Sequence, residues 1–180
     1  MREWRLAGVV AAAVVALDQV LKQAVVSGIP RGEERNVFFG IDLTYVRNEG
    51  IAFGALGDGG ALIVVLTAVA LAFLIGYFAL HARRPWLWLP VGAVAGGALG
   101  NLADRARDGS VIDYLDPALW PAFNLADAAI VIGILGLLYV VEGPRKPRGA
   151  AGEPRAGDAA GEPRAGDAAG EARAGDAAGA

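Results

Sequence analysis

Residues 61–80 read ALIVVLTAVALAFLIGYFAL, and no charged side chain interrupts these 20 residues. A helix that spans the hydrocarbon core of a bilayer needs about 20 mainly apolar residues, so this stretch predicts a membrane-spanning helix. The composition of the chain agrees, because 55% of its 180 residues are hydrophobic, only 19% are charged and the mean hydropathy is +0.44. A soluble domain carries about 25% charged residues.

Three further apolar runs predict three more helices, at about residues 6–26, 86–102 and 126–141. Asp18 and Lys22 interrupt the first run where the cleavage region of a signal peptide would be small and neutral, so we expect a retained helix. Residues 1–143 therefore predict one all-α membrane domain with four transmembrane helices.

Two long loops connect these helices on the same side of the membrane. Residues 36–46 carry β-branched and aromatic side chains around Gly40, which predicts a small extracytoplasmic β-hairpin. Residues 105–123 carry aromatic residues and prolines, which is typical of a segment at the membrane interface. Lys and Arg are slightly more numerous on the opposite side, so the positive-inside rule predicts cytoplasmic termini and a functional site toward the outer face.

Residues 144–180 differ in composition from the rest of the chain. GEPRAGDAA begins at Gly152 and again at Gly161, and a variant with Ala172 in place of Pro begins at Gly170. Because this repeat has no apolar face to bury, we expect a disordered cytoplasmic tail.

The composition excludes several classes of protein. The chain has no Cys and a single histidine, His81, so thiol catalysis, disulfides and His-rich or thiolate metal sites are excluded. The net charge of −3 gives no reason to expect nucleic acid as a partner. Carboxylates and amides are the main groups left for chemistry.

The tetrapeptide Asn-Leu-Ala-Asp occurs at residues 101–104 and again at 124–127. The first copy closes one predicted helix and the second opens the next, on the same side of the membrane. We therefore expect Asp104 and Asp127 to share a water molecule as a general acid–base pair. The helix dipole favours an ionised Asp127 and a protonated Asp104. The structural alternative is that the second copy only caps its helix and that Asp104 pairs with Arg105.

Two other patterns each have two interpretations. Asp18 and Lys22 are four residues apart in the order that favours a helical ion pair, and Lys22 either extends to the interface or anchors a polar site. Gly92, Gly96 and Gly100 form a ladder of small residues, which predicts close helix packing or, alternatively, a groove for an acyl chain.

Five segments in chain order resemble the lipoprotein signal peptidases (signal peptidase II), a family of bacterial intramembrane aspartic proteases. The segments are residues 18–22 (DQVLK), 46–54 (VRNEGIAFG), 96–105 (GGALGNLADR), 111–114 (VIDY) and 123–127 (FNLAD). In this resemblance residues 37–46 correspond to the family's β-cradle and residues 111–120 to its mobile flap region.

The resemblance implies that Asp104 and Asp127 are catalytic. It implies cleavage of a lipid-modified prolipoprotein just before the diacylglyceryl-bearing cysteine, in the bacterial cytoplasmic membrane, with no metal and no cofactor. We further expect a monomer in contact with membrane lipid. The residues that it implies for support of the site or contact with substrate are Asp18, Lys22, Asn48, Gly50, Asn101, Arg105 and Asn124.

Two other functions compete with this interpretation. A small membrane carrier or channel would use the same ionisable residues as a polar pathway. A non-catalytic assembly factor would use only the glycine-mediated helix packing and would tolerate the loss of both acids.

Overall fold

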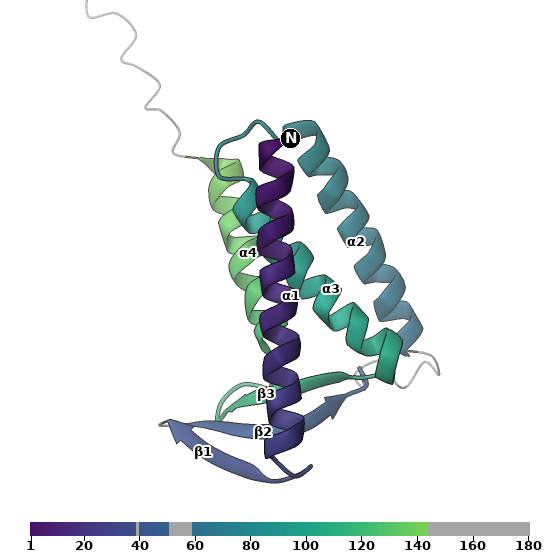
Figure 1. Ribbon diagram of the computed structural model, residues 1–180, viewed down its shortest axis with the longest axis vertical. Coiled ribbons are helices and arrows are strands. Elements are labelled where there is room, and N and C mark those ends of the chain that lie inside the picture. Colours follow the sequence, from purple (N-terminus) through teal and green to yellow (C-terminus); the bar gives the residue numbers. More distant parts are fainter. Residues whose placement is uncertain (39, 51–58, 144–180) are drawn as a thin grey trace, which may run out of the picture. The chain divides into compact units, whose positions relative to one another are not determined.

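The computed structural model describes residues 1–38, 40–50 and 59–143 (Figure 1). In chain order its elements are α1 (Arg2–Gly28), β1 (Glu34–Phe38), β2 (Ile41–Asn48), α2 (Gly59–His81), α3 (Trp88–Asp108), β3 (Val111–Pro117) and α4 (Leu125–Glu142). The tail predicted for residues 144–180 lies outside the described residues.

Three helices of the described chain, α1, α2 and α4, are long and apolar enough to cross a membrane. The fourth helix, α3, is not among them, because its second half carries polar residues such as Asn101, Asp104 and Arg107. It continues past Leu102, where the apolar run ends, to Asp108. Asp104 therefore lies within the body of α3.

Helix α3 packs against α1, α2 and α4 (Figure 1). A Cβ atom at Gly92 or Gly96 would lie 2.7 Å from a backbone carbonyl oxygen of α1. A Cβ atom at Gly97 would clash with the carbonyl oxygen of Ala126 in α4. These contacts confirm the predicted helix packing, and they leave no room for an acyl chain along these faces of α3.

A three-stranded antiparallel sheet, in the order β1-β2-β3, lies where α1 ends and where α2 and α4 begin (Figure 1). Strands β1 and β2 form the predicted hairpin, and Gly40 has the positive φ (73°) that such a turn requires.

The third strand corrects the prediction of an all-α protein with a two-stranded hairpin. Residues 111–117 were expected as an interfacial flap, but they form β3, in which Asp113 is the pairing partner of Val46 in β2. Helices α2 and α3 separate the two strands in the sequence, so no local pattern indicates this pairing.

Candidate active site

The first turn of α4 carries a capping box. Asn124 is the N-cap, and its Oδ1 accepts the Asp127 N–H at 2.9 Å. The Asp127 Oδ2 accepts the Asn124 N–H in return, at 3.3 Å. The second Asn-Leu-Ala-Asp copy therefore does cap its helix, as the structural alternative predicted, and this role fixes the Asp127 side chain.

Two other elements supply partners to the same turn. The Ala126 N–H donates to Asp18 Oδ1 of α1 at 3.1 Å, and the Leu125 N–H donates to the Tyr114 hydroxyl of β3 at 3.1 Å. Burial raises the pKa of Tyr114 to about 12, so the phenol stays neutral. Because the first N–H groups of a helix have no partner within it, these bonds hold α4 against α1 and β3.

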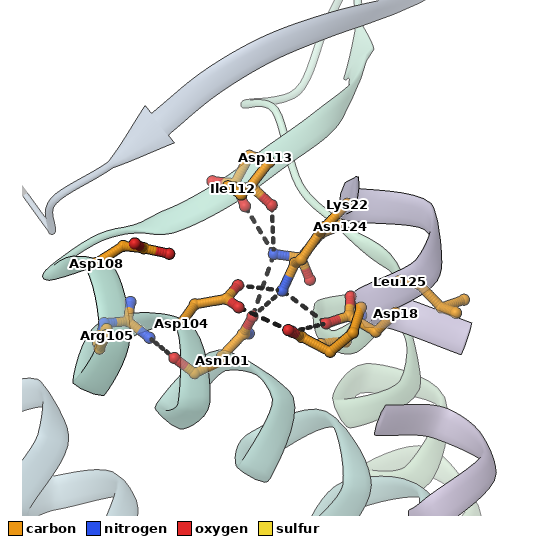
Figure 2. A network of polar contacts seen from close by, with 12 residues as sticks. Asp18, Lys22, Asn101, Asp104, Arg105, Asp108, Ile112, Asp113, Asn124 and Leu125 are labelled. Carbon is orange, nitrogen blue, oxygen red and sulfur yellow. Dashed lines mark hydrogen bonds and ion pairs between the residues drawn. The ribbon is translucent and has the colours of Figure 1, made fainter. Parts of the chain in front are cut away.

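Asp104 is fully buried and contacts a cation at each oxygen (Figure 2). Lys22 Nζ lies 2.6 Å from Oδ2, in an ion pair that lacks hydrogen-bond alignment, and Arg107 Nη2 lies 3.1 Å from Oδ1. The Gln19 amide also donates to Oδ1, at 2.8 Å. Asp104 is therefore held by side chains of α1 as well as by its own helix.

Asp113 of β3 is a second buried acid, and its partners are amides (Figure 2). Asn124 Nδ2 donates to its Oδ1 at 2.8 Å, and Asn48 Nδ2 donates to its Oδ2 at 2.9 Å. Burial and the negative charge of Asp127 raise the pKa of Asp113 from 3.8 to about 6, against the opposing effects of both amides and Lys22. This carboxyl therefore binds a proton more tightly than an ordinary aspartate does.

Asp127 is partly exposed, unlike Asp104 and Asp113. Its Oδ1 accepts the Asn101 amide at 2.8 Å. Its negative charge is one of the causes that raise the pKa of Asp113.

The other predicted site residues gather around these acids. Asn48 Oδ1 accepts the Gly50 N–H at 2.9 Å, and Gly50 has a φ of 75°. Arg105 does not pair with Asp104, because its guanidinium instead lies 3.5 Å from the carbonyl oxygen of Asn101.

Sequence reasoning assigned no role to four residues of the site, namely Gln19, Arg107, Asp113 and Tyr114. Asp113 and Tyr114 lie within the quoted VIDY segment, where an acid between β-branched and aromatic residues was the available signal. Within the described ranges, no group of three His, Cys, Asp or Glu residues is placed to hold a metal ion.

Comparisons with known proteins show which family the chain resembles. A family model described as signal peptidase (SPase) II matches residues 10–141. A lipoprotein signal peptidase of Pelotomaculum thermopropionicum is 45% identical over 138 residues, covering 74% of this chain and 89% of the relative. One from Halothermothrix orenii is 43% identical over 132 residues, covering 71% and 89%. A solved structure of a bacterial membrane enzyme superposes with a TM-score of 0.70 and 28% identity, over 75% of this chain and 91% of the other.

Proposed function

This chain belongs to the signal peptidase II family of bacterial membrane proteases, and from that premise we propose that it removes the signal peptide from diacylglyceryl-modified prolipoproteins. The cut falls just before the lipidated cysteine. The substrate class follows from the relatives, which share most of their length with this chain. We assign the peptidase activity to residues 1–143.

The proposed topology has four membrane spans, with both termini in the cytoplasm and the site at the outer face. Three helices qualify as spans by composition. Support for α3 as the fourth is that its polar Asn101 and Asp104 are buried against neighbouring elements rather than exposed along the bundle.

We assign the catalytic pair to Asp104 and Asp127, the two acids predicted from the sequence. The observation that supports this assignment is that Asn101 of α3 donates to Asp127 Oδ1 at 2.8 Å while its own Oδ1 accepts from Lys22, the cation that contacts Asp104. Asp113, a buried acid held by Asn48 and Asn124, is the alternative partner of Asp127.

The two acids have different roles in hydrolysis. One carboxylate of the pair removes a proton from a water molecule, which attacks the scissile carbonyl carbon, while the other acid, in its protonated form, donates to the carbonyl oxygen. The tetrahedral intermediate then collapses as a proton reaches the leaving amine, and no acyl-enzyme forms. Two acids that share about one negative charge are less costly near a bilayer than two carboxylates.

Three single substitutions in purified enzyme separate the two assignments. We expect D127N and D104N each to lower the cleavage rate of a diacylated prolipoprotein by roughly 10²–10⁴-fold. We expect D113N to stay within about tenfold of wild type, because the partners of Asp113 are the neutral amides of Asn48 and Asn124, which an asparagine can still meet. Asp116, which pairs with Asp42 in the sheet, gives a matched control in D116N.

An active D104N enzyme together with an inactive D113N enzyme would instead establish Asp113 as the partner of Asp127. The same assay with the unlipidated precursor tests the substrate class. Equal cleavage of the lipidated and unlipidated precursors would remove lipid selectivity from the proposal.

A further inference from the structure

The two carboxyl oxygens of Asp104 have different surroundings. Oδ1 accepts two hydrogen bonds, from Gln19 Nε2 of α1 at 2.8 Å and from Arg107 Nη2 of its own helix at 3.1 Å. Oδ2 is buried and lies 2.6 Å from Lys22 Nζ, but within the described part of the chain no aligned hydrogen-bond donor meets it. A buried oxygen without a hydrogen bond is rare in folded proteins and calls for an explanation.

The contacts of Oδ2 lead toward the second acid of the pair. Lys22 Nζ also donates to Asn101 Oδ1 at 3.0 Å (Figure 2), and the Asn101 amide donates to Asp127 Oδ1 at 2.8 Å. The contacts of Oδ1 lead to the surface, because the Arg107 side chain is 58% exposed. Asp104 therefore presents its hydrogen-bonded oxygen to Arg107 and its other oxygen to the contacts that connect it with Asp127.

Gln19 and Arg107 hold each other as well as Asp104. Arg107 Nη2 donates to Gln19 Oε1 at 3.0 Å. A guanidinium group can only donate, so this contact requires the amide oxygen of Gln19 to face Arg107 and leaves its NH₂ group for Asp104. Arg107 is itself held by its Nε, which donates to Asp108 Oδ2 at 3.2 Å. Two donors from two helices therefore converge on the same carboxyl oxygen.

These two donors determine how the Asp104 carboxylate is turned. The torsion that orients an aspartate carboxylate has broad minima, so this group turns easily unless its partners hold it. The ammonium group of Lys22 has three donors and can follow a turning carboxylate. The planar groups of Gln19 and Arg107 cannot follow it in this way, so their hydrogen bonds to Oδ1 fix its plane.

We propose that Gln19 and Arg107 are positioning residues, which hold Asp104 Oδ1 and leave Oδ2 as the oxygen that takes part in proton transfer. Proton transfer requires the reacting oxygen to lie within hydrogen-bond reach of its partner, and a reacting group that turns away reacts more slowly. Neither residue contacts the substrate in this proposal. The inference rests on the proposed function and specifies how one acid of the pair is aimed.

The experiment measures kcat and KM of purified variants with a diacylated prolipoprotein. Q19M removes the donor of α1, and we expect kcat to fall about tenfold, the scale of one hydrogen bond to a charged group. Q19M/R107M removes both donors, and we expect kcat to fall about 100-fold below wild type, the scale of a misplaced reacting group. KM should stay nearly constant in both variants, because neither residue contacts the substrate.

A second double variant, Q19M/R107Q, separates hydrogen bonding from charge. It has the same charge as Q19M/R107M, but its glutamine retains an NH₂ donor three residues from Asp104, a helical spacing at which side chains meet. We expect Q19M/R107Q to recover most of the kcat that Q19M/R107M loses relative to Q19M. Both double variants lack Gln19 and so share its effect on folding. Equal kcat values for the two would overturn the proposal, and so would a loss of activity that appears in KM alone.

The matched control is Q23M, because Gln23 lies one helical turn further along α1 and is exposed. We expect its kcat and KM to equal those of wild type. Unfolding of both double variants at a temperature where Q23M stays folded would also overturn the proposal, since Gln19 and Arg107 would then serve stability. A wild-type enzyme that leaves the diacylated prolipoprotein uncut would contradict the proposed function instead.

Discussion

Asn124 connects Asp113 to the first turn of α4 through a single amide. Its Nδ2 has two hydrogens and three acceptors within 3.3 Å, namely Asp113 Oδ1, Asn101 Oδ1 and the carbonyl oxygen of Ile112. Its Oδ1 caps the Asp127 N–H at the same time. This one amide therefore holds α3, β3 and α4 together at the site.

The pKa of Asp113 makes a prediction for stability. In the folded protein this pKa is about 6, above its ordinary value of 3.8. The folded state therefore binds the proton more tightly than the unfolded state does, and its stability falls as the pH rises from about 4 to about 6. We expect Asp113 to contribute a loss on the order of 1–3 kcal/mol over this window. Thermal unfolding of the purified protein at a series of pH values measures it.

The control is D113N, which has no proton to bind at this position. The difference in unfolding midpoint between pH 4 and pH 6 should shrink in D113N relative to wild type. An unchanged difference would mean that another group causes the pH dependence.

At the scale of residues, most members of the site could be predicted from the sequence. The spacing of Asp18 and Lys22 predicted their ion pair, and the structure confirms it. Lys22 is buried, so it does not extend to the interface. The repeated tetrapeptide made Asp104 and Asp127 look equivalent, but the two copies differ in helix position. Asp104 lies within α3 beside Lys22, whereas Asp127 lies in the first turn of α4.

At the scale of elements, the close approach of α3 to its neighbours determines how precisely the site is held. Gly97 faces the backbone of Ala126, next to Asp127. On the opposite side of the same contact, a Cβ atom at Gly133 of α4 would lie 2.6 Å from the Val94 side chain. Small residues on both helices therefore set the distance between the backbones that carry Asn101 and Asp127.

Substitution of Gly97 by alanine tests this packing. The added methyl group would meet the α4 backbone, which cannot move aside as a flexible side chain can. We expect G97A to lower the free energy of unfolding by about 1–3 kcal/mol and to lower kcat, because α4 must shift. The control is G8A on α1, where an added Cβ has no neighbour within 4 Å. Equal unfolding midpoints for G97A and G8A would contradict the packing argument.

Hydropathy predicted helices α1, α2 and α4, but it predicted neither the end of α3 nor strand β3. Long apolar runs predicted α1, α2 and α4, because a helix that faces lipid needs an apolar composition. The end of α3 was missed because its polar residues face a buried network rather than lipid. Strand β3 was missed because its hydrogen-bonding partner, β2, precedes α2 and α3 in the chain.

At the scale of the whole molecule, the proposed topology predicts where reporter fusions are active. Alkaline phosphatase, which is active only outside the cytoplasm, should be active when fused after residue 33 or residue 109. A fluorescent protein that matures only in the cytoplasm should be bright after residue 84 or residue 143. Identical reports from residues 84 and 109 would show that α3 does not span the membrane.

The hydrogen bond between Asp18 and the Ala126 N–H joins the first helix to the last. Asp18 is synthesised long before Ala126, so its carboxylate lacks this hydrogen-bond donor while the rest of the chain is being made. Lys22, one helical turn away, travels with it and balances its charge during that interval. We therefore expect the nascent chain to enter the bilayer before the site is complete. We expect proteolytic activity only after α4 has been synthesised.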